Sequence, residues 1–354
     1  MLYLGRFEED RDNLVEAERW FRRAADSGDI DAVYNLAYFL KDSDPIESEA
    51  LCREGVSKVD PRCMHGLGTI LRNRGDLQGA QDWYRKAAES GNDYAMNSLG
   101  NLLYESGDVE GAEKWYRRSA EIGSTQGMVW VGVIANKEGR VDESVEWFTR
   151  ASEAGDLWGD SNLGTHFREA GERELAIHYF ERAAVGGRTS AMVNLGQLFE
   201  DRGDVHIAKD WYRRAADEGS ADGMENLGVI ASRVGKESDA EGWFRRAIEA
   251  GSSSAMVWLG LLLEDDGRIA EAEELYRTAA SEGEASAMVN LGRICARSNR
   301  LREATNWYIR ADALGHQGAL RGIESVKKRR VRRAVLVVAV AGFATSLLLR
   351  LRRK

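Results

Sequence analysis

The side chains that most often carry chemistry are few in this chain, and their spacing matches no known catalytic or metal-binding motif. No histidine pairs with a cysteine at the spacing of a zinc site. The metalloprotease, phosphate-loop and serine-hydrolase motifs HExxH, GxxxxGK[ST] and GxSxG are all absent. The residues concerned are His65, His166, His178, His206, His316, Cys52, Cys63 and Cys295. We therefore expect no enzyme activity, metal, cofactor or small-molecule substrate.

The bulk composition indicates a helical protein of a reducing compartment. Proline occurs only twice in 354 residues and charged residues make up 30%, and helices tolerate surface charges but are broken by proline. Three cysteines are too few, and odd in number, for a disulfide framework. The N-terminal sequence MLYLGRFEEDRDN lacks the basic and apolar regions of a secretory signal. We expect the body of the protein to stay in the cytosol.

Charge divides the chain into two parts. The last 28 residues hold ten lysines and arginines and no acidic residue, so residues 1–326 carry a net charge of −19 although the whole chain carries −9. An acidic body lacks the basic surface that nucleic acids require. We expect no nucleic-acid partner for this part of the chain.

Three kinds of residue recur every 32 positions. Leu-Gly pairs begin at Leu67, Leu99, Leu163, Leu195, Leu227, Leu259 and Leu291, with Val131-Gly132 filling the gap. A second column reads Trp83, Trp115, Trp147, Tyr179, Trp211, Trp243, Leu275 and Trp307, and seven of the eight methionines keep the same period. A fixed period of this length is the signature of a repeat array.

One repeat unit, residues 190–219, predicts a pair of antiparallel helices. Apolar residues at helical spacing indicate a first helix over 190–202 and a second over 205–218. Two such helices joined by a tight turn form an αα-hairpin. The expected capping residues are Ser190 and Asp204 at the helix starts and Gly203 and Gly219 at the ends.

Ten such hairpins fit between Met1 and Gly315. Leu4-Gly5 already holds the Leu-Gly position, so the first hairpin begins part-way into its leading helix, either as the natural start or because upstream residues are missing. The second unit, 29–59, is one residue short and has Leu51-Cys52 in the aromatic position. Residues 316–326 are expected to form a last helix that caps the stack.

The order Leu195-Gly196, Ala208, Trp211-Tyr212 and Ala215 resembles the tetratricopeptide repeat, and the ending WYRRAADEG resembles its Sel-one-like branch. The resemblance covers residues 1–326 and implies an all-α, right-handed solenoid of about ten antiparallel hairpins. It also implies an adaptor that binds proteins or peptides on its concave face, which the first helices line. The period of 32, methionine in place of the family's first tryptophan and glycine in place of its closing proline depart from the usual pattern.

The resemblance also suggests which residues contact a partner. The family places an asparagine directly before the Leu-Gly leucine to hold a peptide backbone or its terminal carboxylate, and an amide both donates and accepts hydrogen bonds. The corresponding residues are Asn35, Asn162, Asn194, Asn226 and Asn290. The alternative is that an exposed polar residue is merely tolerated there.

Two tryptophans, Trp130 and Trp258, occupy the same position as these asparagines. Tryptophan in an exposed groove often anchors a partner. It is equally expected to be buried against a neighbouring hairpin, because tryptophan is highly buried on average. We expect the methionine column to lie in the core, and basic pairs such as Arg213-Arg214 to form a solvated face.

The C-terminal segment 327–354 predicts a membrane anchor. Its uncharged run, 334–349, has 16 residues and spans about 24 Å as a helix, slightly short of a bilayer core of about 30 Å. The flanking cations that could snorkel or meet lipid headgroups are Lys327, Lys328, Arg329, Arg330, Arg332, Arg333, Arg350, Arg352, Arg353 and Lys354. The alternatives are an interfacial helix and a nuclear or nucleic-acid signal. The larger number of cations before the run favours cytoplasmic repeats.

These features predict a membrane-tethered scaffold that binds a protein or peptide on its concave face. The alternative is a regulatory or accessory subunit assembled permanently with an enzyme or envelope machine. An enzyme would require a pocket with perturbed carboxylates.

Overall fold

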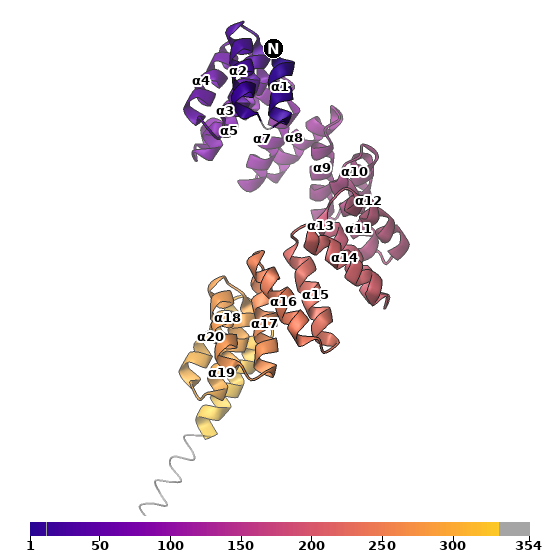
Figure 1. Ribbon diagram of the computed structural model, residues 1–354, viewed down its shortest axis with the longest axis vertical. Helices are drawn as coiled ribbons and strands as arrows, with labels where there is room; N and C mark the ends of the chain where they lie inside the picture. Colours follow the sequence, from indigo (N-terminus) through magenta and orange to yellow (C-terminus); the bar gives the residue numbers. More distant parts are fainter. Residues whose placement is uncertain (12, 333–354) are drawn as a thin grey trace, which may run out of the picture. The chain divides into compact units, whose positions relative to one another are not determined.

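The computed structural model describes residues 1–11 and 13–332 (Figure 1). It contains helices and no strand in these residues, which confirms the all-α prediction. The chain forms two compact units, Met1–Ala183 and a second one that begins at Ala184. Each unit is a solenoid-like row of antiparallel helix hairpins in which consecutive helices pack side by side.

The first unit contains five complete hairpins and the leading helix of a sixth. Its helices are α1 (Leu2–Asp10), α2 (Leu14–Asp26), α3 (Ile30–Leu40), α4 (Pro45–Ser57), α5 (Pro61–Asn73), α6 (Leu77–Glu89), α7 (Asp93–Glu105), α8 (Val109–Glu121), α9 (Thr125–Lys137), α10 (Val141–Glu153) and α11 (Leu157–Glu169). The partner of α11, helix α12 (Arg173–Val185), begins in the first unit and ends in the second.

The second unit continues the same pattern. Its helices are α13 (Thr189–Asp201), α14 (Val205–Asp217), α15 (Ala221–Arg233), α16 (Glu237–Glu249), α17 (Ser253–Asp265), α18 (Ile269–Ser281), α19 (Ala285–Arg297) and α20 (Leu301–Ala313). A further helical segment, 318–332, follows α20.

Two 13-residue helices and two three-residue connections fill the 32-residue period, as α13 and α14 show. The predicted bounds are wrong by one residue, because α13 begins at Thr189. Arg188 is its N-cap residue, so Ser190 lies inside the first turn and caps nothing. Asp204 is the N-cap residue of α14 as predicted, but its side chain accepts no capping hydrogen bond and instead accepts one from Nε of Arg202.

Both connections turn through a residue with a left-handed backbone, which explains the abundance of glycine. Gly203 has φ 88° and Gly219 has φ 84°, values that only glycine adopts without strain. From residue 75 to residue 315 this conformation recurs every 16 residues, and Asn299 replaces glycine at one position. Val59 holds the equivalent position before α5 with φ 62°, which is unfavourable for a β-branched side chain.

The Leu-Gly pair and the aromatic pair meet in the core of each hairpin. Leu195 is fully buried, and Gly196 beside it leaves room for the ring of Tyr212, which is also fully buried. A Cβ atom on Gly196 would lie 2.4 Å from Tyr212 Cε1. The methionine column lies mostly in this core, as predicted, with Met64, Met96, Met128, Met192, Met224 and Met288 buried.

The second hairpin is irregular for a related reason. Its aromatic position holds Cys52, which is small and buried, and the Leu-Gly position correspondingly reads Leu36-Ala37. Without a large ring there, a Cβ atom on Ala37 is tolerated, and Ala37, Cys52 and Leu67 form one core cluster. Helix α3 has only 11 residues and a four-residue connection follows it, which accounts for the missing residue.

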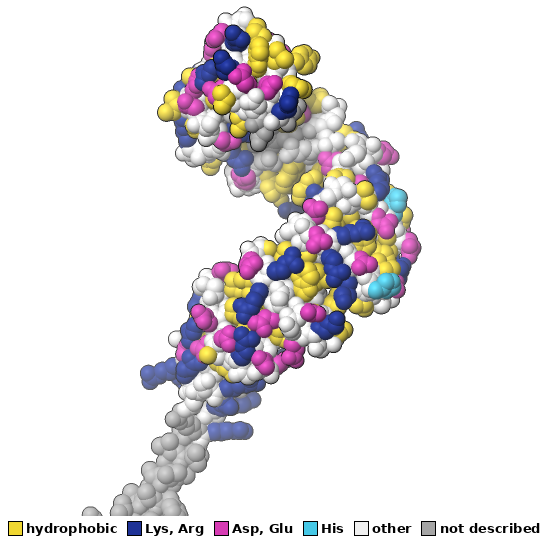
Figure 2. Space-filling view, viewed as in Figure 1, with side chains coloured by type: hydrophobic (Ala, Val, Ile, Leu, Met, Phe, Trp, Pro, Cys, Tyr) yellow, Lys and Arg dark blue, Asp and Glu magenta, His cyan; other side chains and the backbone are white. Residues whose placement is uncertain are grey.

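The basic pairs on the second helices are more ordered than a solvated face. The second member of most pairs lies over the preceding aromatic ring, as Arg214 does over Trp211 at 4.6 Å. In the second unit, Arg277 occupies the first position of the pair, with Thr278 in the second, and joins an ion-pair network that links α18 to α20. Arg277 and Arg300 both bind Glu273 at 2.7 Å, and both also bind Glu303. Figure 2 shows such basic and acidic side chains interleaved on the surface.

The segment 318–332 closes the end of the second unit, as predicted for residues 316–326. Ala319 and Val326 are buried, and Val326 packs in a cluster with Cys295 and Tyr308. Lys327, Lys328, Arg329, Arg330 and Arg332 are exposed on this helix, and Figure 2 shows basic side chains gathered there.

The predicted membrane anchor falls beyond the last described residue, Arg332. No helix among the described residues has the length and apolar character needed to cross a membrane. The apolar run 334–349 and the cations Arg333, Arg350, Arg352, Arg353 and Lys354 lie outside the described residues. The anchor and the handedness of the solenoid therefore remain predictions.

Candidate functional site

The predicted contact residues lie on first helices of hairpins, but they do not form a single site. The first unit contains Asn35, Trp130 and Asn162, and the second contains Asn194, Asn226, Trp258 and Asn290. Trp130 and Asn162, which occupy equivalent positions in successive hairpins, line one cavity together.

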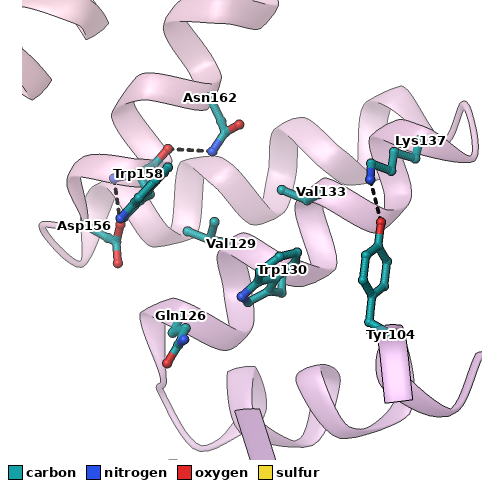
Figure 3. A pocket seen from close by; sticks show the side chains of 9 residues that line it. All are labelled: Tyr104, Gln126, Val129, Trp130, Val133, Lys137, Asp156, Trp158 and Asn162. Carbon is teal, nitrogen blue, oxygen red and sulfur yellow. Dashed lines mark hydrogen bonds between the residues drawn. The ribbon is translucent and has the colours of Figure 1, made fainter. Parts of the chain in front are cut away.

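This cavity of about 670 Å³ lies on the first helices of three successive hairpins, α7, α9 and α11 (Figure 3). Its lining residues are Tyr104, Gln126, Val129, Trp130, Val133, Lys137, Asp156, Trp158 and Asn162, and we call it the aromatic cavity. The lining is mostly apolar, with a few polar groups at its edges, which is the usual composition of a ligand site.

Trp130 is both a core residue and a cavity wall, so the two alternatives for this residue are not exclusive. Its ring stacks on Tyr116 with centroids 5.5 Å apart and planes 9° apart, and it lies 5.8 Å from the ring of Tyr104. Trp130 is half-buried and packs on the core of the first unit. The stacking fixes the indole in place, so the cavity has a preformed wall.

Trp158 faces the cavity from α11 and was not singled out from the sequence. Its side chain is 58% exposed, which is unusual for the largest apolar residue type. A signal was available, because the equivalent residues in the following hairpins are small or acidic: Ser190, Asp222, Ser254 and Ser286. Trp158 lies one helical turn before Asn162, on the same face of α11.

The asparagine amides are partly engaged within their own helices. Asn162 Nδ2 donates to the Trp158 carbonyl at 2.8 Å, and Asn226 Nδ2 donates to the Asp222 carbonyl at 2.8 Å. Asn35 makes the same bond to the carbonyl of Asp31. Each of these Nδ2 groups uses one of its two N–H donors in this bond, so the amide still offers a second donor and its Oδ1 acceptor.

The asparagines differ in the contacts of their Oδ1 atoms and in burial. Asn35 Oδ1 accepts a hydrogen bond from Arg6 at 3.1 Å, and Asn290 Oδ1 accepts one from Arg293 at 3.1 Å. Asn194 is half-buried on α13.

Trp258 is held by the neighbouring hairpin. Its side chain is 41% exposed on α17, and its indole N–H donates to Glu225 Oε1 on α15 at 3.0 Å. Because a hydrogen bond already occupies its polar atom, Trp258 would offer a partner its ring face alone.

The aromatic cavity has opposite charges at its two ends (Figure 3). At one end Lys137 Nζ donates to the hydroxyl of Tyr104 and lies 5.1 Å from the centre of the Tyr104 ring. At the other end Asp156 caps α11, with Oδ1 accepting from the backbone N–H of Trp158 at 2.7 Å and of Gly159 at 3.3 Å. The cap fixes the position of the carboxylate.

Comparison with known proteins identifies the family. The family model described as tetratricopeptide repeat matches residues 65–127, 161–223, 193–255, 226–286 and 259–319, which together make up more than half of the chain. The chain belongs to the tetratricopeptide repeat family. The Sel1 repeat model matches residues 1–29 and 141–156. No curated protein matches the sequence.

Solved structures support the same fold. A protective antigen of uropathogenic Escherichia coli with an SLR fold is 24% identical, with 92% of this chain and 78% of that chain covered and a TM-score of 0.54. A Sel1 repeat protein from Oxalobacter formigenes is 26% identical over 61% of this chain and 98% of that chain, with a TM-score of 0.51. Yeast Tom70 is 11% identical over 95% and 96%, with a TM-score of 0.58. A tetratricopeptide repeat protein of this kind is a scaffold for protein–protein interaction.

A smaller cavity of about 360 Å³ in the first unit contains a cysteine and a histidine, but their pKa shifts do not suit a nucleophilic pair. Cys52 and His65 both line it. Burial raises the pKa of the Cys52 thiol to about 11 and lowers the pKa of His65 to about 4. At neutral pH the thiol is protonated and the imidazole is uncharged, whereas a cysteine nucleophile requires a thiolate.

A cluster with potential metal ligands in the second unit is better explained by ion pairing. Ligand atoms of Glu273, Cys295 and Glu303 lie within 4.8 Å of one another. Both carboxylates already bind Arg277 and Arg300. Burial raises the pKa of the Cys295 thiol to about 11. Two guanidinium groups and a protonated thiol make this cluster unsuitable for a cation.

Proposed function

We propose that this protein is a membrane-tethered scaffold that captures a linear peptide segment of a partner protein in the aromatic cavity. The observation that carries the proposal is the pairing of Trp130, a fixed wall, with Trp158, a 58% exposed indole, across one cavity. Tryptophans in such positions are the residue type most enriched among binding hot spots.

The cavity offers a peptide both apolar contact and backbone recognition. An apolar side chain that enters between Trp130 and Trp158 would displace water from the faces of both rings. Asn162 lies beside them. Its bond from Nδ2 to the Trp158 carbonyl holds the amide in place, and Oδ1 can accept a hydrogen bond from a peptide N–H. The second unit contributes no residue to this cavity.

The C-terminal segment supplies the proposed tether. Its 16-residue uncharged run lies between clusters of cations, so we place the repeats on the cytoplasmic side and the run in the bilayer. Tethering raises the effective concentration of the scaffold toward partners at the same membrane.

Peptide capture is tested by panning a random peptide library against the full chain in detergent. We expect enriched peptides that bind the unchanged chain and lose most of their affinity with Trp158→Ala. The matched control is Trp115→Ala, which removes a half-buried tryptophan from α8 in the same unit, outside the cavity. Peptides that bind equally well to Trp158→Ala would contradict capture in the aromatic cavity.

The tether is tested by flotation with phosphatidylcholine vesicles, with and without phosphatidylglycerol. We expect the full chain to float with both and to stay bound in high salt, and a chain lacking residues 331–354 to remain in solution. Release of the full chain by salt would favour the interfacial helix. Flotation of the shortened chain would show that the tail is not the sole anchor.

A further inference from the structure

Successive first helices contact each other through one recurring pair of positions. The next-to-last residue of one helix pairs with the residue 33 positions later, which is the last residue of the next first helix. The pairs are Arg72 with Glu105 at 2.7 Å, Glu264 with Arg297 at 3.6 Å, and Glu200 with Arg233. In each of these contacts an acidic and a basic side chain neutralise each other.

The same pair of positions within the aromatic cavity lacks its acid. Tyr104 on α7 and Lys137 on α9 are also 33 residues apart, and Lys137 Nζ donates to the Tyr104 hydroxyl. A phenol accepts this hydrogen bond but carries no negative charge at neutral pH. No carboxylate lies within ion-pair distance of Lys137 in the part of the chain that the structure describes.

The cation is therefore left unneutralised at the rim of a mostly apolar cavity. At the opposite end Asp156 supplies a fixed carboxylate, because it caps α11. A ligand with a negative group at the Lys137 end and none at the Asp156 end matches both charges. Charge complementarity of this kind mainly sets specificity and register.

We propose, on the basis of the peptide capture proposed above, that the partner segment contributes the acidic side chain that pairs with Lys137. In other hairpins the chain itself contributes the acidic member of this pair. The segment carries a large apolar side chain that fits between Trp130 and Trp158. An aspartate or glutamate side chain on one side of that residue pairs with Lys137, and the other side of the segment, near Asp156, bears no acid.

The test selects peptides by panning against the full chain and measures their affinities by fluorescence polarisation. We expect the enriched peptides to contain an apolar residue with an acidic residue on one side of it only. Replacing that acid by its amide should weaken binding to the unchanged chain about five-fold, the upper range for an exposed ion pair. The same replacement should change nothing with Lys137→Gln, and Lys137→Glu should select basic peptides instead.

A second variant supplies the acid within the protein. Tyr104→Glu recreates the acid–base pair seen between Glu200 and Arg233, so we expect the preference for acidic peptides to disappear while dependence on Trp158 remains. The matched control, Arg233→Gln in the second unit, should leave peptide selection unchanged.

The outcomes separate this inference from the proposed function. Peptides that need Trp158 but show no acidic residue, or whose acid is insensitive to Lys137→Gln, would overturn the inference and leave peptide capture standing. The absence of any peptide that depends on Trp158 would overturn both.

Discussion

Gly196 on α13 lies directly against the ring of Tyr212 on α14, so closely that a Cβ atom would stand 2.4 Å from Tyr212 Cε1. The same contact recurs along the chain, with Gly100 against Tyr116 and Gly260 against Tyr276. Glycine at this position allows the two helices of a hairpin to bury a full aromatic ring between them.

The first prediction concerns this contact. Gly196→Ala forces the fully buried Tyr212 or the helix backbone to move, so we expect the free energy of unfolding to fall by about 1–3 kcal/mol. Urea denaturation followed by circular dichroism measures the change. Gly242→Ala is the control, because Gly242 is exposed inside α16 with nothing near its Cβ position. It should stabilise the helix by about 0.5–1 kcal/mol.

The second prediction concerns the left-handed valine before α5. Val59 has φ 62° and an exposed side chain, so Val59→Gly removes strain and little packing. We expect a gain in stability of about 1 kcal/mol, measured by thermal unfolding. Val234→Gly replaces another exposed valine, at φ −96°, and should give no gain. Equal effects of the two substitutions would argue against strain at Val59.

The third prediction is a pH dependence set by the network between α18 and α20. Hydrogen bonds from Arg300 and then Arg277 lower the pKa of Glu273 to about 2. A carboxyl group whose pKa is depressed on folding stabilises the protein above its unfolded pKa and loses that effect as the pH falls. The contribution of Glu273 should therefore be complete at pH 6 and largely lost near pH 2.

Glu273→Gln removes this contribution and makes the test specific. We expect the variant to be less stable than the unchanged chain at pH 6, with the difference shrinking as the pH approaches 2. Urea midpoints measured across this range give the difference. The exposed neighbour Glu274 provides the control, since Glu274→Gln should leave the pH profile unaltered. A difference that is constant from pH 6 to pH 2 would contradict the account.

The fourth prediction separates the two tryptophans of the cavity. Trp130→Ala removes a ring that stacks on Tyr116 and packs on the core, so it should cost about 3 kcal/mol of stability as well as affinity. Trp158→Ala removes an exposed ring, so it should reduce affinity and alter stability by less than about 0.5 kcal/mol. Denaturation and peptide binding on the same samples distinguish the two roles.

The repeat architecture could be predicted from the sequence because the residues that form the helices and the residues that end them recur at a fixed period. The column of Leu-Gly pairs and the aromatic column specify the two helices, and Gly203 and Gly219 specify where each ends. The irregular second hairpin was also visible, through Cys52 in the aromatic position. The start of α13 was misplaced because the turn at Gly187, rather than the hydroxyl of Ser190, sets where the helix begins.

Only part of the candidate site could be predicted from the sequence, because only some of its residues occupy a repeating position. Trp130 and Asn162 were found because they occupy a repeating position, which the period reveals. Trp158 lies at a position that varies between hairpins, so the period does not mark it. The charge of Lys137 became informative only once the structure showed that its cross-helix partner is Tyr104.

The most direct test of the account is ¹⁹F NMR of the full chain with all ten tryptophans replaced by 5-fluorotryptophan, titrated with a selected peptide. The resonances of Trp130 and Trp158, assigned by single Trp→Phe variants, should shift saturably. Those of Trp115, Trp211 and Trp243, which lie on second helices, should stay in place. Saturable shifts in the second-helix tryptophans, with Trp130 and Trp158 unchanged, would contradict capture on the first-helix face.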